Sequence, residues 1–342
     1  MSLEMSNSSE TSFLRRVLVV FGLVILALVL YQLSDVVLLV FGSVLIAVLM
    51  RAIARPLQAE TSMSERVSLV TAIVGIISFL VLISYLFGTQ ITDQLSSLST
   101  TLPDAARHIS RDIPIAKLFA ESSAGALMAN ALSFGTSIFG AAAAVVLMLV
   151  GGIYLALRPK FYKRGFVMLF PKGRQPLIES TMDDAGAALR VWLGSQFLAM
   201  IIVGVMTAIG LALVGVASPL ALGVIAGGLE FVPIVGPVLA AIPALLIASS
   251  QDWQTAAWTL LVFVIVQQTE SNILMPLLVG RAAGVAPAVG LFAVVAVGVL
   301  FGPLGLLLGY PVAIVADVAI RKLYVREALG EKVDIPGADE SN

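Results

Sequence analysis

Long apolar runs separated by short polar stretches dominate the pattern of the chain. In the first half these runs extend from about residue 13 to 50, interrupted at YQLSD, and then cover about 67–87 and 136–157. A helix needs about 20 mostly apolar residues to cross roughly 30 Å of hydrocarbon, and these runs approach that length. The strands of a membrane barrel would alternate apolar and polar residues, which these runs do not. The pattern therefore predicts an all-α, polytopic integral membrane protein.

From residue 191 to about 320 the chain is nearly all apolar, with interruptions that contain proline, glycine and polar residues. We expect a span at 191–214, a segment broken by proline and glycine at 219–248, another span at about 254–275, and a pair at about 286–302 and 304–320. The whole chain then has about seven to nine membrane segments, because the broken segments leave the number open.

Two segments of different composition separate the apolar runs. Residues 88–135 carry apolar residues at helical spacing, interrupted by Pro103 and Pro114, which predicts short external amphipathic helices. These helices either cap the membrane portion or provide a contact between subunits. Residues 158–190 mix basic and aromatic side chains, which is typical of a segment at the lipid headgroups.

The predicted organisation is a disordered tail (1–12), an N-terminal hairpin with a third span (13–87), the external segment (88–135), a fourth span (136–157), the basic interfacial segment (158–190), a transport core with broken hairpins (191–325) and a cytoplasmic tail (326–342).

The distribution of basic residues predicts the orientation of the chain. If the third and fourth spans cross fully, only Arg107, Arg111 and Lys117 fall on one side, where acidic residues outnumber them. By the positive-inside rule both termini are then cytoplasmic and residues 88–135 are external. The two broken segments enter from opposite sides in this arrangement, as inverted repeats do in secondary transporters.

Composition narrows the chemistry. Of the 342 residues, 59% are hydrophobic and 12% are charged, and the formal net charge of -1 does not favour nucleic acid as a partner. The chain has no cysteine and a single histidine, His108, which excludes disulfides, thiolate chemistry and histidine or cysteine metal clusters. It also has no phosphate-binding loop, so we do not expect it to hydrolyse ATP, to act as an enzyme or to need a cofactor. Transport would be passive, driven by a gradient or powered by another subunit.

The stretch GGLEFVPIVGP, residues 227–237, contains the first candidate for chemistry. An ionisable group in a membrane segment is costly unless it is paired or hydrated, so Glu230 is a functional candidate by default. Pro233 lacks an amide hydrogen and clashes with the carbonyl four residues earlier, so we expect the peptide oxygens around 229–233 to be partly free. A carboxylate beside free carbonyls is typical of a cation or proton site. Alternatively, Glu230 caps the broken helix or pairs with a basic group, and the prolines only shape a hairpin.

A second candidate, Glu270, lies among the polar residues of QQTESNILMP. It is a candidate gate or coupling site near the cytoplasmic mouth, and an ion pair with Arg281 across Pro276 is the structural alternative. A hydroxyl-rich solute would also need hydrogen-bonding groups, for which the candidates are Gln196, Gln267 and Asn272.

Glycines recur at G-x-x-x-G spacing in the C-terminal part. The pairs are Gly223 with Gly227, Gly298 with Gly302, and Gly305 with Gly309. This spacing lets helix backbones approach closely in lipid, so it predicts tight packing and is not specific for any substrate.

Three motifs, GGLEFVPIVGPVLAAIPALLIA, TESNILMPLLVGRAAGVAP and LFGPLGLLLGYPVAIV, resemble in sequence and order the C-terminal signatures of the autoinducer-2 exporter family of bacterial permease-like membrane proteins. The resemblance covers about residues 13–325 and implies a multi-pass inner-membrane transporter that forms homo-oligomers. Members are associated with export of the quorum-sensing furanone or with sodium/proton antiport. Ala286 stands where histidine often precedes the proline, which leaves the two glutamates as the titratable candidates. The positions that match the motifs are Glu230, Pro233, Gly236, Pro237, Glu270, Asn272, Pro276, Gly302, Pro303, Gly305 and Pro311.

Three functions remain open from the sequence. The first is transport of a small polar solute, such as an autoinducer-2-like furanone, without an ATPase of its own. The second is sodium/proton antiport in which Glu230 and Glu270 bind ions and protons by turns. The third is a membrane scaffold whose external helices bind partners. The expected partners are thus the lipid bilayer, a small polar solute, Na+ or H+, and further copies of the chain.

Overall fold

The computed structural model describes residues 32–61, 63–78, 143–233, 235–278 and 285–338, together with Val17, Phe21, Ile25, Val81 and Tyr85. Within these ranges every regular element is a helix and none is a strand, which confirms the predicted all-α architecture. The predicted external helices at 88–135 and the tail at 1–12 lie outside the described residues.

The helices follow one another with short connections. Residues 65–78 and Ala143–Leu157 are helical. The other elements are α2 (Ser34–Thr61), α5 (Pro159–Val167), η1 (Lys172–Arg174), α6 (Gln175–Val214), α7 (Pro219–Leu229), α8 (Val235–Gln251), α9 (Trp253–Thr269), η2 (Glu270–Leu274), α10 (Met275–Leu278), α11 (Pro287–Ala319) and η3 (Ile320–Arg326).

Several helices are long and apolar enough to cross a membrane. By length and composition four qualify among the described residues, in Ser34–Thr61, Lys172–Val214, Trp253–Leu278 and Ala288–Arg326. Ala143–Leu157 and α5 would form a fifth span only as a pair, and they bend by 92° at their junction. The shorter apolar helices α7 and α8 flank the predicted break. Because four helices are long and apolar enough to cross, the protein is a multi-pass membrane protein.

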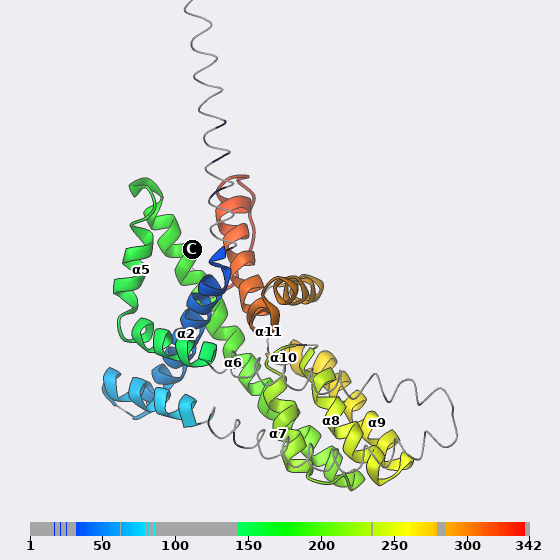
Figure 1. Ribbon diagram of the computed structural model, residues 1–342. Helices are drawn as coiled ribbons and strands as arrows, with labels where there is room; N and C mark the ends of the chain where they lie inside the picture. The colour runs from blue at the N-terminus through cyan, green and yellow to red at the C-terminus, as the bar shows by residue number, and fades with distance from the viewer. Residues whose placement is uncertain are drawn as a thin grey trace, which may run out of the picture.

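Helix α6 connects the two ends of the molecule. Its 40 residues make it about 60 Å long, roughly twice the thickness of the hydrocarbon core. Its first half carries Glu179, Asp183 and Asp184, so this half lies outside the hydrocarbon, in the region where the sequence predicts an interfacial segment up to residue 190. In Figure 1, α7, α8 and α9 gather at the C-terminal end of α6, whereas α5 and the C-terminal end of α11 lie toward its N-terminal end.

The two backbones of α6 and α7 approach closely at small residues. A Cβ atom added to Gly227 would lie 2.5 Å from the carbonyl oxygen of Met200, and one added to Gly223 would lie 2.6 Å from that of Gly204. Ordinary contacts begin at 3.4 Å, so only glycine fits at either position. The tight packing predicted from the G-x-x-x-G spacing is confirmed here, and it fixes the hairpin that α7 begins against α6.

Helix α11 folds back on itself at Gly302. This residue has φ 65° and ψ -147°, a conformation that is accessible essentially only to glycine, and Pro303 follows it. The two arms pack antiparallel, because a Cβ atom on Gly298 would meet Leu306 and one on Gly305 would meet the carbonyl of Val297. The first arm, residues 287–301, is about 22 Å long, shorter than the hydrocarbon core of roughly 30 Å. The predicted pair of segments on either side of residue 303 is confirmed as a broken hairpin.

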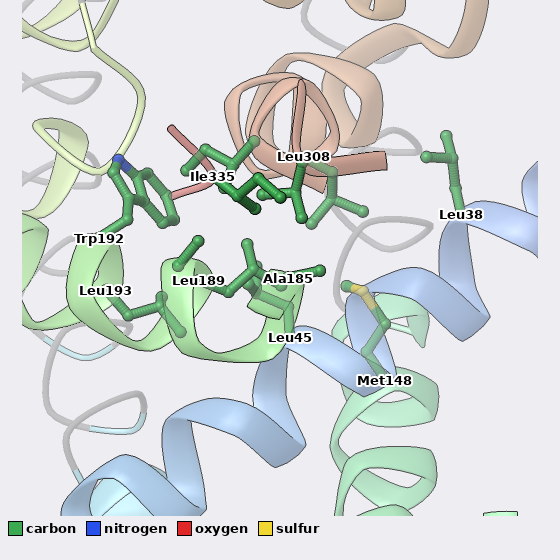
Figure 2. Packing of buried hydrophobic residues seen from close by; sticks show 12 residues of the cluster. Leu38, Leu45, Met148, Ala185, Leu189, Trp192, Leu193, Leu308 and Ile335 are labelled. Atoms are coloured by element: carbon green, nitrogen blue, oxygen red, sulfur yellow. The ribbon is translucent and has the colours of Figure 1, made fainter. Parts of the chain in front are cut away.

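The largest buried cluster lies where α2, α6 and α11 meet. It includes Leu45, Leu189, Trp192 and Leu308, and Figure 2 shows these side chains packed between the helices. Ile335, from the chain that follows η3, also belongs to this cluster. The residues after α11 therefore return to cover α6 and α11.

Candidate functional site

The break between α7 and α8 has a local cause. Helix α7 ends at Leu229, the next four residues form turns, and α8 begins at Val235 with Pro237 in its first turn. Gly236 lies so close to the end of α7 that an added Cβ atom would come within 2.0 Å of the carbonyl oxygen of Leu229. Glycine and proline thus shape the turn, as the sequence predicted.

The expectation of free carbonyls in this turn is wrong for most of them. The carbonyl of Leu229 accepts the amide hydrogen of Val232 at 3.0 Å, and that of Val232 accepts from Gly236 at 2.9 Å. The side-chain amide of Gln196 on α6 donates to the carbonyl of Glu230 at 2.6 Å. Proline removes an internal helix bond, but tight turns and a neighbouring side chain replace it because an unpaired carbonyl in an apolar interior is costly. The turn therefore offers a carboxylate rather than a ring of carbonyls.

The side chain of Glu230 is completely buried. Neither of its carboxyl oxygens receives a hydrogen bond from a donor among the described residues. The next residue, Phe231, packs edge to face on Trp192 at 5.8 Å between ring centroids, and Trp192 stacks on Tyr310 at 5.6 Å. These aromatic contacts, together with Gln196, hold the turn of the hairpin between α6 and α11.

The partner of Glu230 is the other predicted glutamate. Glu270 lies at the end of α9, where the helix widens into the π-helical segment η2, and its side chain is buried. Its carboxyl group is close enough to that of Glu230 for the two groups to interact. Gln267, one turn earlier, donates to Oε2 of Glu270 at 3.1 Å and orients this carboxyl group.

Two carboxyl groups in this position cannot both remain ionised without a shared proton or a bound cation. Each ion loses its hydration on burial, and the two negative charges repel each other in a medium of low dielectric. A proton shared between them, or a small cation coordinated by both, removes the repulsion and gives the oxygens of Glu230 the partner they lack. The arrangement is thus suited to bind and release a proton or a cation.

Sequence comparisons identify the family to which the chain belongs. Residues 20–324 match the family described as AI-2E family transporter. The chain belongs to the AI-2E transporter family. It is 32% identical over 165 residues to a protein named putative transport protein YrrI of Bacillus subtilis, which covers 48% of this chain and 47% of that protein. It is 24% identical to putative transport protein YueF of the same organism over 74% of this chain and 75% of that one. With AI-2 transport protein TqsA of Escherichia coli it shares 23% identity over 81% of this chain and 84% of that protein.

In this AI-2E family transporter, some of the predicted polar residues lie at the glutamate pair and others do not. Gln196 donates to the backbone carbonyl of Glu230, and Gln267 donates to the carboxyl group of Glu270. Asn272 is exposed and donates to the carbonyl of Gln268 at 2.9 Å, so it does not join them. Arg281, the alternative partner of Glu270, lies outside the described residues.

Pro276, which lies between Glu270 and Arg281, does not interrupt the helix. Pro276 lies inside α10, and the chain remains helical from α9 through η2 into α10. The amide of Met275 bonds to the carbonyl of Glu270, five residues earlier. This wider π turn makes room for the proline ring and its missing donor, so the bulge replaces the break. The π segment also sets the position of Glu270. Such bulges occur frequently at functional sites.

The aromatic residues around the turn were not predicted to belong to the site. Trp192 and Tyr310 come from α6 and from the second arm of α11, and both lie within apolar runs in the sequence. The only local signal is that Trp192 and Gln196 are four residues apart, which places them on one face of α6.

A cavity of about 560 Å³ lies beside the turn in this AI-2E family protein. It is lined by α2, the helices at 65–78 and Ala143–Leu157, α6, α11, the end of α7, and Phe231 from the turn. Among the described residues of this lining, Thr71 alone has a polar side chain, so they do not provide the hydrogen bonds that a polar solute needs. The glutamate pair, and not this cavity, is therefore the candidate site.

Proposed function

We propose that this membrane transporter carries a small polar solute, an autoinducer-2-like furanone or a similar metabolite, and couples its movement to a proton or cation bound by Glu230 and Glu270. It does so without an ATPase of its own, in a bacterial inner membrane, with both termini in the cytoplasm and as a homo-oligomer. The name of the relative TqsA, an AI-2 transport protein, supports the choice of solute.

The observation that carries this proposal is the buried carboxyl pair at a broken hairpin. Glu230 has no donor among the described residues, and Glu270 faces it from another helix. A cation or proton bound between the two carboxyl groups holds their helices together. When it leaves, the two negative charges repel each other and favour separation of the helices. Occupancy of the pair would thus bias two arrangements of α7 and α9, as coupling in a secondary transporter requires.

Sodium/proton antiport at the same pair is the second candidate function. It is favoured by the chemistry of the site, because two carboxyl groups supply oxygen ligands for a small cation and titrate when it is absent. Among the described residues that line the neighbouring cavity, only Thr71 has a polar side chain, so the cavity offers no binding site for a polar organic solute.

Proteoliposomes separate these functions. The variants Glu230→Gln and Glu270→Gln keep the shape of the side chain and remove its charge, and Glu331→Gln, on an exposed part of the C-terminal segment, is the control. We expect gradient-driven furanone uptake and coupled proton movement to fall at least tenfold in both variants and to remain in the control. Sodium/proton exchange by the parent protein in vesicles that carry no furanone, and its loss in both Glu→Gln variants, would identify the antiporter. Full coupled activity of both variants would refute a coupling role for the pair.

A further inference from the structure

The short helix α5 exposes its aromatic side chains, whereas an ordinary amphipathic surface helix buries its apolar ones. Its aromatic residues Phe161, Tyr162 and Phe166 are all exposed, and Tyr162 and Phe166, four positions apart, share one face. Lys163 and Val167 share another. In a water-soluble helix the aromatic face would pack against the protein, but here the opposite face does.

The inward face of α5 is held to α6 by polar contacts. Val167 is buried, and Nζ of Lys163 lies 3.1 Å from Oε1 of Glu179 and 2.7 Å from Oδ2 of Asp183. Both carboxylates belong to the first half of α6, which lies outside the hydrocarbon. The orientation of α5 about its axis is therefore fixed by two ion pairs and one buried side chain.

The outward face of α5 is large and apolar. Phe161 is 70% exposed and Phe166 is 48% exposed, and the turn that follows adds Leu169 at 78%. Phe161 packs edge to face on Tyr162 at 5.3 Å, and Phe166 contacts Phe170 at 5.5 Å, so the rings form two packed pairs. An apolar surface of this kind on one short helix indicates a lipid or protein partner.

Basic side chains surround this surface. They are exposed, they form no ion pair with another described residue, and they are Arg158, Lys160, Arg164, Lys172 and Arg174. Residues 158–174 contain no aspartate or glutamate. The partner therefore presents apolar groups beside a negative charge.

The direction of α5 fits the plane of a bilayer. The helix turns by 92° from Ala143–Leu157, so when that helix follows the bilayer normal, α5 lies parallel to the membrane surface. Aromatic rings then reach the acyl boundary while lysines and arginines lie among the headgroups.

We propose that residues 158–174 form a docking surface for anionic phospholipid headgroups, with the aromatic face of α5 inserted at the bilayer surface. A second copy of the same surface is disfavoured as the occupant, because it would place these unpaired cations against their own equivalents. Each basic residue near an anionic membrane strengthens attachment by roughly fivefold, and this attraction is screened by salt.

The absence of cysteine in the chain allows a direct test with one labelled position. Gly165 lies between Phe161 and Phe166, and a Cβ atom there would meet nothing within 4 Å. Gly165→Cys would carry an environment-sensitive fluorophore, and Gly186→Cys on α6, where space is also open, is the control. The full chain is placed in nanodiscs of neutral phosphatidylcholine or of phosphatidylcholine with anionic phosphatidylglycerol.

We expect the label at position 165 to shift to the blue and to resist quenching by iodide in the anionic nanodiscs, and to be quenched in neutral ones or at high salt. The double variant Lys160→Gln/Arg164→Gln should lower the ratio of attached to detached label by roughly 25-fold, from fivefold per charge. Lys332→Gln, in the C-terminal segment, should not change it.

A second variant, Phe161→Ser/Phe166→Ser, should lose the blue shift while the charges remain. Equal protection in neutral and anionic nanodiscs, or quenching in both, would overturn the proposal. Protection in detergent that rises with protein concentration would also overturn it, since a second copy of the chain would then cover the surface.

Discussion

The close crossing of α6 and α7 makes Gly227→Ala a sensitive test of the packing that supports the glutamate pair. The new methyl group would lie 2.5 Å from the carbonyl oxygen of Met200 and 3.1 Å from Cα of Gly204. Both contacts are backbone atoms, which cannot move aside by changing a rotamer. The methyl is about 0.9 Å short of ordinary contact at 3.4 Å, so the two helices must separate by a similar amount.

The magnitude follows from two opposing effects. Overpacking of this kind costs about 1 to 3 kcal/mol. Replacing glycine by alanine within a helix recovers about 0.5 to 1 kcal/mol. We therefore expect a net loss of about 0 to 2.5 kcal/mol in the free energy of unfolding, with a middle value of about 1 kcal/mol. Gly194→Ala, on a part of α6 where a methyl meets nothing within 4 Å, shows only the helix effect and should stabilise the protein.

The assay is thermal unfolding of the two purified variants in the same detergent, followed by helical circular dichroism and by proteoliposome transport. Gly227→Ala should melt a few degrees below the parent and Gly194→Ala slightly above it. Transport by Gly227→Ala should also fall, because separation of the helices lengthens the 2.6 Å hydrogen bond from Gln196 to Glu230. A melting temperature of Gly227→Ala equal to or above that of Gly194→Ala would refute this account of the crossing.

Four further predictions address other parts of the molecule. Gly302→Ala should destabilise the α11 hairpin by about 1 to 3 kcal/mol through backbone strain alone, and an unchanged melting temperature would contradict this. Gln196→Leu leaves the carbonyl of Glu230 unpaired, at a cost of about 1 to 3 kcal/mol in unfolding experiments, and should reduce transport as well. Gly337→Ala places a methyl 2.4 Å from a backbone carbonyl of α6, so the C-terminal segment should detach and become sensitive to added protease, unlike the parent. Hydrogen bonds from the side chain and then the amide of Thr255 lower the pKa of Asp252, the N-cap of α9. The stability from this charge is present above the unfolded pKa of about 3.9 and fades as the pH falls through the folded pKa. The melting temperature of Asp252→Asn, which caps without titrating, should therefore change less between pH 5 and pH 3.

The sequence by itself determined the class of the protein, the breaks in its helices and its family. The length of the apolar runs set the membrane architecture, because the cost of crossing hydrocarbon depends on composition over about 20 residues and not on packing. The turns at Glu230 and at Gly302 were predictable for a similar reason. Proline and glycine act on the backbone of their own neighbourhood, so their effect on a helix can be inferred locally.

The tertiary structure decided which of these local features form a site. Glu230 and Glu270 lie on different helices, and only the crossing of α6, α7 and α9 brings their carboxyl groups together. The same crossing directs Gln196 to the carbonyl of Glu230, one of those around 229–233 that were predicted to be partly free. The π segment that carries the chain through Pro276 was also absent from the local pattern, because the sequence shows where a hydrogen bond is lost but not how the fold replaces it. Which face of α5 turns outward was likewise decided by contacts with Glu179 and Asp183, which are distant in the sequence.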